Sequence, residues 1–310
     1  MSKLVNRLLS SSIRVRNALR RLPLPQRIYR HLHFQGAVDV SIDHIHHFQM
    51  RHFGYQVEND LFWSGYGNGW EATSLRLWAA LAARSGQILD IGANTGVYSL
   101  AAKAMNVDAR VIAFEPLARI AARLRENVAL NGLDVEVIEA GVSDSSGKST
   151  IFDPDIEHAY SASLNPDMLS GIENVRKTEI SVVRIDDFAA ERGGSSIDLV
   201  KLDVEKHEIA VLEGFGKIIA RDCPSFLLEI LGPEYGAEVK RFFKGLDYAF
   251  FAIEEGKCVR KVEQLGATPG NHLLCQRSLA HALGLGQETS HAGICTSSVT
   301  KAIRSRAGLR

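Results

Sequence analysis

The chain has few cysteines, no long apolar run and no excess of charge of either sign. Its four cysteines stand far apart without a Cys-x-x-Cys pair, which argues against a zinc site or a disulfide scaffold and favours a reducing cytoplasm. No apolar run approaches the roughly 20 residues that cross a bilayer, so we expect a soluble protein, at most peripheral at the inner membrane face. Basic and acidic residues balance at 36 each, which argues against a nucleic-acid partner because such proteins usually show a basic excess.

Charge is nevertheless uneven along the sequence. Residues 1–38 hold eight Lys or Arg residues and no acid. Within them Leu4, Leu8, Val15 and Leu19 recur at near-helical spacing, which predicts an amphipathic basic helical extension. Two interpretations stay open, namely contact with an anionic membrane surface and packing against the rest of the protein.

Four segments are expected along the chain. After the basic extension, residues 39–75 are rich in aromatic residues and histidine and are expected to fold over a ligand as a lid. Residues 76–278 form the main domain, and residues 279–310, rich in Gly, Ser, Thr and Ala, are expected to be a flexible tail. His44 and His47 would share a helical face, but no acid or cysteine at ligand spacing completes a set, so we predict no metal site.

The main domain alternates apolar strands with helical patterns, which predicts an α/β sheet with helices on both faces. The expected strands are Gln87–Ile91, Arg110–Glu115, Val135–Ala140, Ser149–Phe152, Glu179–Arg184, Ile197–Asp203, Ser225–Ile230, Tyr248–Ile253 and His272–Gln276. A helix is expected over Val204–Ile219. The polar stretch of roughly 25 residues before Glu179 is long for a connection and is a candidate wall of a substrate pocket.

A glycine-rich turn follows the first of these strands. It reads Asp90-Ile-Gly92-Ala-Asn94-Thr-Gly96 and leads into a helix, and the next strand ends on Glu115, nineteen residues after Gly96. An acid at the tip of the second strand of a doubly wound sheet binds ribose hydroxyls. This arrangement predicts a nucleoside-binding site.

The loop differs from the Gly-x-Gly-x-x-Gly of dinucleotide sites, since Asn94 stands where the second glycine admits a pyrophosphate. Asp90 would repel a pyrophosphate and favour a positively charged group. No Gly-Lys-Ser/Thr follows, so a P-loop is excluded. S-adenosylmethionine carries an ammonium, a sulfonium and free ribose hydroxyls, and it fits Asp90 and Glu115 better than NAD does. A loop that merely connects strand and helix is the alternative.

The sequence resembles the FkbM family of S-adenosylmethionine-dependent methyltransferases over about residues 60–276. The resemblance is carried by Leu89-Asp-Ile-Gly-Ala-Asn-Thr-Gly-Val-Tyr-Ser99, Ala113-Phe-Glu-Pro116, Glu126-Asn-Val-Ala-Leu-Asn131, Gly141-Val-Ser-Asp144, Arg184-Ile-Asp-Asp187, Val200-Lys-Leu-Asp-Val-Glu205, Leu228-Glu-Ile230 and Asn271-His-Leu-Leu274. It implies a class I methyltransferase fold, a Rossmann-like doubly wound sheet that is mostly parallel with an antiparallel last strand. It also implies O-methylation of a hydroxyl on a sugar, a glycan or glycolipid, or a secondary metabolite.

The resemblance also assigns cofactor residues by their matched positions. They are Asp90, Gly92, Asn94, Gly96, Glu115, Pro116, Ser143, Asp144 and Asp203. By this correspondence Ser143 and Asp144 lie on the adenine side and Asp203 lies beside the methyl donor. One position departs from the family pattern Asp-Val-Glu-Gly, because Lys206 replaces the glycine. A side chain there is expected to narrow the pocket, to alter the acceptor or to mark a decayed enzyme.

Methyl transfer to an alcohol requires a group that takes the hydroxyl proton. We predict His207 as this base because it follows Asp203 by four residues and its reference pKa suits neutral pH. Glu205 and Glu229 are further catalytic candidates near the same strand ends. Glu205 has an alternative role as a helix N-terminal acid. Asp203 with Glu229 would otherwise be a divalent-metal pair, but two oxygens do not complete a site.

Three other functions are weighed against this one. A nucleobase methyltransferase of the amino-methylating type carries an Asn/Asp-Pro-Pro-aromatic motif after the fourth strand, and Asp203-Val-Glu-Lys206 has no proline. A protein methyltransferase remains an alternative. A cofactor-binding scaffold or partner subunit that has lost catalysis is the non-enzymatic alternative, and Lys206 is its support.

Overall fold

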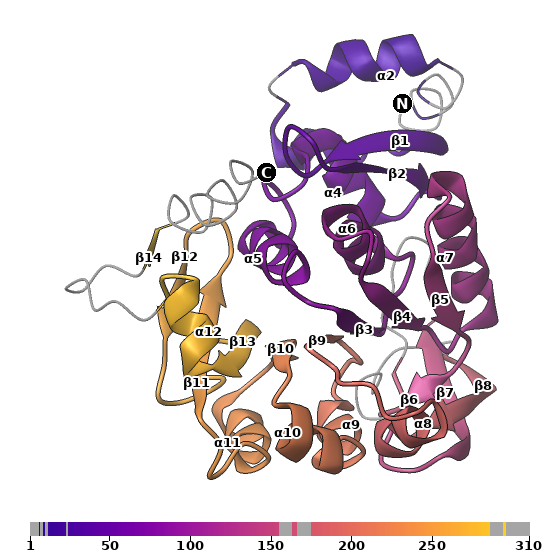
Figure 1. The fold of residues 1–310 in the computed structure, drawn as a ribbon. Helices are drawn as coiled ribbons and strands as arrows, with labels where there is room; N and C mark the ends of the chain where they lie inside the picture. Colours follow the sequence, from indigo (N-terminus) through magenta and orange to yellow (C-terminus); the bar gives the residue numbers. More distant parts are fainter. Residues whose placement is uncertain are drawn as a thin grey trace.

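A nine-stranded sheet forms the centre of the molecule in the computed structural model (Figure 1). The structure describes residues 6, 9, 12–22, 24–154, 163–165, 175–285 and 294–295. The strands of this sheet are β3 Gln87–Ile91, β4 Arg110–Phe114, β5 Val135–Ile138, β9 Leu199–Leu202, β10 Ser225–Ile230, β11 Tyr248–Glu254, β12 Cys258–Lys261, β13 Gly270–Gln276 and β14 Ile294–Cys295. Their order is β14-β12-β11-β13-β10-β9-β3-β4-β5.

The strands β5, β4, β3, β9 and β10 pair in parallel, and β13 enters antiparallel between β10 and β11. In the central register Leu89 lies between Ile112 of β4 and Val200 of β9. β3, β4, β9 and β10 are buried on both faces, so their sequences are mostly apolar. The predicted mostly parallel, doubly wound sheet with an antiparallel strand is confirmed.

Among the strands that were not predicted is β12. Residues 258–261 were expected to form part of a polar turn between the last two strands, but they pair with β11 as β12. Val259 is the buried residue of this strand, while Arg260 and Lys261 are exposed. A strand of four residues with one buried apolar side chain carries too little alternation to be recognised in sequence.

Helices cover both faces of the sheet (Figure 1). One face carries α5 Ala72–Ala82, α6 Val97–Met105 and α7 Ala118–Asn131, and the other carries α8 Ile185–Glu191, α9 Glu208–Glu213, α10 Gly216–Asp222 and α11 Pro233–Arg241; α12 Arg277–Ala282 follows β13. Each layer has its own apolar core, with Leu100 and Trp78 fully buried in the first and Phe215 and Phe226 in the second.

The single helix expected over Val204–Ile219 is wrong. Glu205 and Lys206 adopt left-handed backbone angles, with φ of 55° and 66°. The chain therefore makes a turn after β9, and α9 begins only at Glu208. A second break follows at Gly214, where a Cβ would lie 2.3 Å from the carbonyl oxygen of Ser143. The close approach of these two backbones therefore requires glycine at this position, between α9 and α10.

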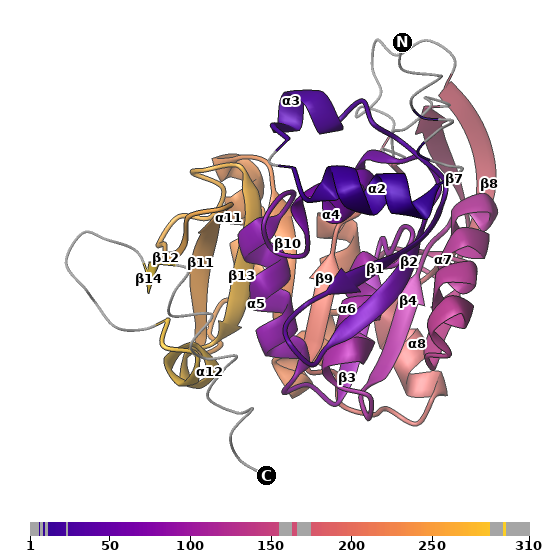
Figure 2. The ribbon, with the colours of Figure 1, turned by 90° about the horizontal axis from the view of Figure 1, so that it is seen from above.

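The N-terminal segment forms a hairpin, β1 Gly36–Ser41 and β2 His47–His52, which lies outside α6 and α7 (Figure 2). It is joined by α2 Ile13–Arg20, α3 Gln26–Tyr29 and α4 Gln56–Ser64. His44 lies in the turn of the hairpin and His47 begins β2, so the helical face expected for them is wrong. The sequence lacks the long apolar pattern that would have made a helix of this segment, and its alternate buried residues fit a hairpin.

The basic extension packs against the protein. Val15 and Leu19 of α2 contact the core, and the guanidinium of Arg16 lies 4.6 Å from the ring centre of Phe34. The apolar face of α2 is therefore covered by the protein itself and gives no support for membrane contact. Leu4 and Leu8 lie outside the described residues, as does most of the expected tail after residue 285. No helix in the described part of the chain is long and apolar enough to cross a membrane.

Two asparagines of α7 attach the hairpin to the main domain. Asn127 accepts a hydrogen bond from Arg51 N at 2.8 Å and donates to Thr95 O at 2.8 Å. Asn131, one turn later, accepts from Gln49 N at 2.6 Å and donates to Gln49 O at 2.7 Å. Both side chains thus satisfy backbone groups on the edge of β2, as a neighbouring strand would do.

We expect Asn127→Ala to lower the free energy of unfolding by about 1–3 kcal/mol, because Asn127 is fully buried and two backbone groups lose their partner. Chemical denaturation measures the change. The neighbouring Glu126→Ala serves as the control. Glu126 is a half-exposed partner of Arg51, so its loss is expected to cost no more than about 0.5 kcal/mol. Equal effects of the two substitutions would contradict this role of Asn127.

Candidate active site

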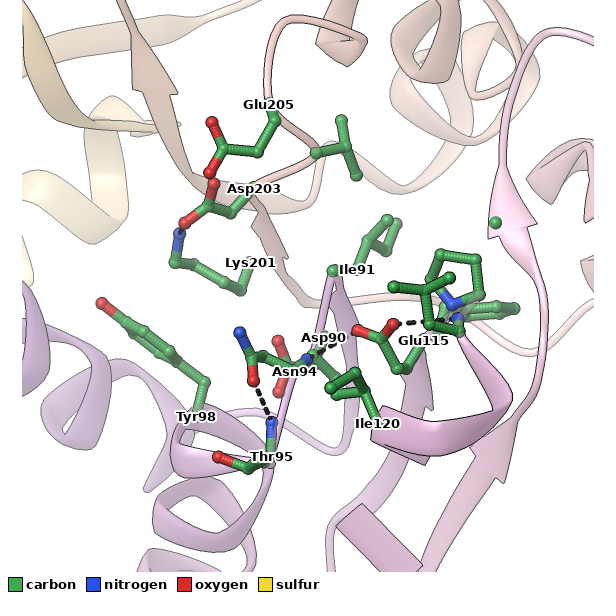
Figure 3. Close-up of a pocket in the computed structure, with 18 of the residues that line it drawn as sticks. Asp90, Ile91, Asn94, Thr95, Tyr98, Glu115, Ile120, Lys201, Asp203 and Glu205 are labelled. Atoms are coloured by element: carbon green, nitrogen blue, oxygen red, sulfur yellow. Dashed lines mark hydrogen bonds and ion pairs between the residues drawn. The ribbon is translucent and has the colours of Figure 1, made fainter. Parts of the chain in front are cut away.

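A cavity of about 460 Å³ opens at the carboxyl ends of β3, β4 and β9 (Figure 3). Ligands of open α/β sheets bind at this edge, and the volume is in the range of small-molecule sites. The glycine loop forms one wall and the acid at the end of β4 forms another. From the segment expected as a lid, Gln56, Val57, Trp70 and Glu71 line the cavity, while the β1–β2 hairpin covers α6 and α7 instead.

The glycines of the loop are required by close contacts with neighbouring elements. At Gly92, with φ of 80°, a Cβ would lie 1.8 Å from the carbonyl oxygen of Asp203. At Gly96, with φ of 96°, it would lie 2.2 Å from Cδ1 of Leu124. Asn94 also has a left-handed φ of 52°, which asparagine tolerates better than most residues. The loop therefore lies directly against β9 and α7, which brings Asp203 next to the loop.

Glu115 lines the cavity directly after the end of β4. Its carboxylate accepts hydrogen bonds from Asn94 N and Leu117 N, both at 3.0 Å (Figure 3). Burial raises the pKa of Glu115 to about 7, although these two amides oppose the shift. A carboxylate has about four acceptor positions, so two remain for the two hydroxyls of a ribose.

Asp90 lies beneath the loop and is fully buried. It accepts a hydrogen bond from Ser99 Oγ at 2.6 Å. Burial raises the pKa of Asp90 to about 6, and a cation nearby would favour its ionised form. The ammonium and sulfonium of S-adenosylmethionine are such cations, so the residues of the cavity fit this cofactor.

Apolar residues of a small second sheet, of α7 and of the insertion form the far end of the cavity. The sheet consists of β6 Gly141–Val142, β7 Gly147–Pro154 and β8 Val175–Val183 in the order β6-β8-β7. Ile120, Val142, Ile151 and Leu164 line the cavity there. Leu164 comes from the long insertion, and its neighbour Ser163 pairs with Phe152 of β7 through two backbone hydrogen bonds. The described part of the insertion thus contributes to the cavity wall.

Three carboxylates line the opposite end, where β9 and β10 terminate. Asp203 and Glu205 follow β9, and Glu229 lies on β10. Burial and the neighbouring Asp203 raise the pKa values of Glu205 and of Glu229 to about 7 each. In Figure 3 the side chains of Asp203 and Glu205 extend side by side from the end of β9. We call these three residues the acidic wall.

Comparison with known proteins identifies the family. The methyltransferase FkbM domain matches residues 90–250, just over half of the chain. The chain belongs to the FkbM methyltransferase family. The residues of the cavity fit the cofactor of such a domain, S-adenosylmethionine. The predicted family and cofactor are confirmed.

Curated relatives match parts of this FkbM methyltransferase. The 31-O-demethyl-FK506 methyltransferase FkbM of Streptomyces tacrolimicus is 32% identical over 151 residues, covering 41% of this chain and 58% of the relative. The 2-O-methyltransferase NoeI of Sinorhizobium fredii is 34% identical over 138 residues, covering 41% and 56%. The antimetabolite synthetase AmbE of Pseudomonas aeruginosa is 28% identical over 185 residues, covering 50% and 9%. The match thus spans less than two thirds of each relative.

Among solved structures, an S-adenosylmethionine-dependent methyltransferase of Agrobacterium tumefaciens aligns at 15% identity with a TM-score of 0.43, covering 77% of this chain and 70% of that one.

Two residues expected on the adenine side, and the expected base, lie together outside the cavity wall. Ser143 Oγ lies 2.9 Å from Nε2 of His207 and donates to Asp144 at 3.1 Å. None of these three residues belongs to the cavity lining within the described chain. His207 is the N-cap residue of α9 after the left-handed turn, and burial lowers its pKa. Their assigned roles stay predictions.

Lys206 is exposed and does not line the cavity. Its φ of 66° is the conformation that glycine adopts without strain, which explains the family's glycine at this position. The expected narrowing of the pocket by this side chain is therefore wrong. The backbone of this turn is held by two side chains of the insertion. Asn165 Nδ2 donates to Lys206 O at 3.3 Å, and Ser163 Oγ donates to Glu205 O at 2.5 Å.

We expect Lys206→Gly to raise the free energy of unfolding by about 1 kcal/mol, since a left-handed residue with a Cβ is strained. Thermal unfolding measures the change, and affinity for S-adenosylhomocysteine should not change. Lys206→Ala is the matched control, because it removes the same side chain but keeps the Cβ. Equal stabilisation by both variants would show that the side chain and not the backbone causes the effect.

Three further residues of the cavity were missed in the sequence. Lys201 of β9 is buried and donates to Asp203 Oδ2 at 3.0 Å. Glu71 accepts from the Tyr98 hydroxyl and from Asn271 Nδ2 at 2.9 Å, which joins the segment before α5 to α6 and β13. A lysine inside an otherwise apolar strand was the one available signal. Among the described residues no group of three or more His, Cys, Asp or Glu is placed to hold a metal ion.

Proposed function

We propose that this FkbM methyltransferase transfers a methyl group to a hydroxyl of a small molecule, namely a sugar, a glycan or glycolipid, or a secondary metabolite. The observation that carries the proposal is the acidic wall. It lies in the same cavity as Asp90 and Glu115, and it contains carboxylates whose pKa values of about 7 suit a base at neutral pH. Two relatives, the 31-O-demethyl-FK506 methyltransferase FkbM and the 2-O-methyltransferase NoeI, support the same reaction class by similarity.

We further propose Glu205 as the base, in preference to His207. Glu205 lines the cavity, whereas His207 contacts Ser143 beside it. When bound, S-adenosylmethionine supplies an electrophilic methyl group and leaves as the neutral thioether. The acceptor hydroxyl loses its proton to the Glu205 carboxylate while its oxygen forms the new bond to carbon, so Glu205 ends protonated and releases the proton to solvent.

Two other functions are weighed against this proposal, namely that of a protein methyltransferase and that of a cofactor-binding scaffold without turnover. The small-molecule acceptor is preferred because the relatives 31-O-demethyl-FK506 methyltransferase and 2-O-methyltransferase NoeI are named for methylation at oxygen. The scaffold alternative rested on Lys206, which does not line the cavity.

The test has two stages. Calorimetric titration with S-adenosylmethionine, S-adenosylhomocysteine and NAD comes first, and we expect binding of the first two alone. Methyl-labelled cofactor is then supplied with fractionated cell extract, and we expect label in small-molecule, glycan or lipid fractions that resists alkaline hydrolysis, as a methyl ether does. Label in precipitated protein would favour a protein methyltransferase, and cofactor binding without label in any fraction would favour the scaffold.

A further inference from the structure

Lys201 is an unusual residue for its position. It lies in the middle of the central sheet, on β9 between Val200 and Leu202, and its side chain is 2% exposed. Burying an ammonium is costly unless an opposite charge and hydrogen bonds compensate it. A strand that only served the core would carry an apolar residue here, so the charge calls for a reason in the site.

The surroundings of Lys201 keep it charged. Its ammonium donates to Asp203 and lies 5.0 Å from the ring centre of Tyr98, a cation–π contact (Figure 3). Burial would lower the pKa of Lys201, but Asp203, Glu71 and Asp90 together raise it well above its ordinary value. A permanently protonated lysine cannot take a proton from the acceptor, so it does not serve as the base.

We propose that Lys201 is a positioning residue, which pairs with Asp203 and offsets the negative charge of the acidic wall so that Glu205 can act as a base at neutral pH. This inference rests on the proposed function, in which Glu205 receives the hydroxyl proton. Without Lys201, Asp203 would lose its ion-pair partner and three carboxylates would share one end of the cavity.

The charges around Glu205 make the expected direction clear. Four charged groups act on its pKa, namely Lys201 of β9, Asp203 directly after β9, Glu229 of β10 and Glu208 of α9. The carboxylates among these raise the pKa of Glu205 and Lys201 lowers it. Removing the cation therefore leaves only repulsion between the carboxylates, and Glu205 would hold its proton to higher pH.

The test is a titration of Glu205 by carboxyl carbon NMR on the full chain, with Glu205→Gln to assign the signal. In Lys201→Met we expect the midpoint of Glu205 to rise by about one pH unit or more, and in Lys201→Arg, which keeps the charge, to stay within about 0.3 unit of wild type. In Asp203→Asn we expect the opposite shift, downward. Lys103→Met is the matched control, because Lys103 of α6 is another buried lysine, which donates to Ala109 O, and its loss should leave the midpoint of Glu205 unchanged.

An unchanged midpoint in folded Lys201→Met, or shifts of the same sign in Lys201→Met and Asp203→Asn, would overturn the proposal. If Lys201→Met does not fold, a midpoint in Lys201→Arg or Asp203→Asn that departs from the stated direction overturns it equally. Failure of the proposed function is read separately, from absent cofactor binding or absent methyl transfer in the wild type, because the NMR titration needs neither cofactor nor acceptor.

Discussion

Replacing Glu115 with alanine is expected to weaken binding of S-adenosylhomocysteine by roughly 10- to 100-fold, about 1–3 kcal/mol. The carboxylate accepts hydrogen bonds from Asn94 N and Leu117 N, and it has acceptor positions left for two ribose hydroxyls. Its loss removes the ribose contacts and also releases the loop that carries Asn94. Calorimetric titration at constant pH measures the change, and thermal unfolding confirms that the variant is folded.

Glu139→Ala is the control for this prediction. Glu139 follows β5, pairs with Arg125 at 2.9 Å and is 43% exposed, so its removal changes the net charge equally without touching the cavity. Binding by this variant should match the wild type. Unchanged affinity in Glu115→Ala would remove Glu115 from the ribose site and leave the cofactor held by other groups.

The fold and the cofactor side of the site could be predicted because their signals are local in sequence. The apolar runs of β3 and β4 each end on an acid, and the sheet brings Asp90 and Glu115 to one edge. A strand ends where its apolar run ends, and parallel strands present their carboxyl ends together. No tertiary information beyond the order of strands is needed for that conclusion.

The acceptor side could not be predicted in the same way. Lys201, Tyr98 and Glu71 meet from three elements that are distant in sequence, and their contacts depend on how α5 and α6 pack on the sheet. Spacing failed for His207 as well. A helical turn after Asp203 was assumed, but the left-handed angles at Glu205 and Lys206 direct Glu205 into the cavity and place His207 against Ser143. Neither residue is glycine in this chain, so the glycine of the family pattern at position 206 was the one signal for this turn.

The choice between Glu205 and His207 as the base leads to the largest expected effect. Glu205→Gln should lower kcat at least about 100-fold, since an amide cannot take a proton, while affinity for S-adenosylhomocysteine stays close to wild type. His207→Gln should retain most of the turnover if its role is to contact Ser143. The pH profile gives a second readout: the wild-type kcat should rise as pH passes about 7, where Glu205 ionises, and this rise should disappear in Glu205→Gln.

Methyl transfer from labelled cofactor to the acceptor found in the extract screen measures these rates, with Glu213→Gln as the control. Glu213 is an exposed acid of α9 outside the cavity lining, so its variant should retain the wild-type rate and pH profile. A large loss in His207→Gln with near-normal turnover in Glu205→Gln would return the base to the histidine. Near-normal turnover in both would leave Glu229 as the carboxylate of the acidic wall to replace next, because burial raises its pKa to about 7 as well.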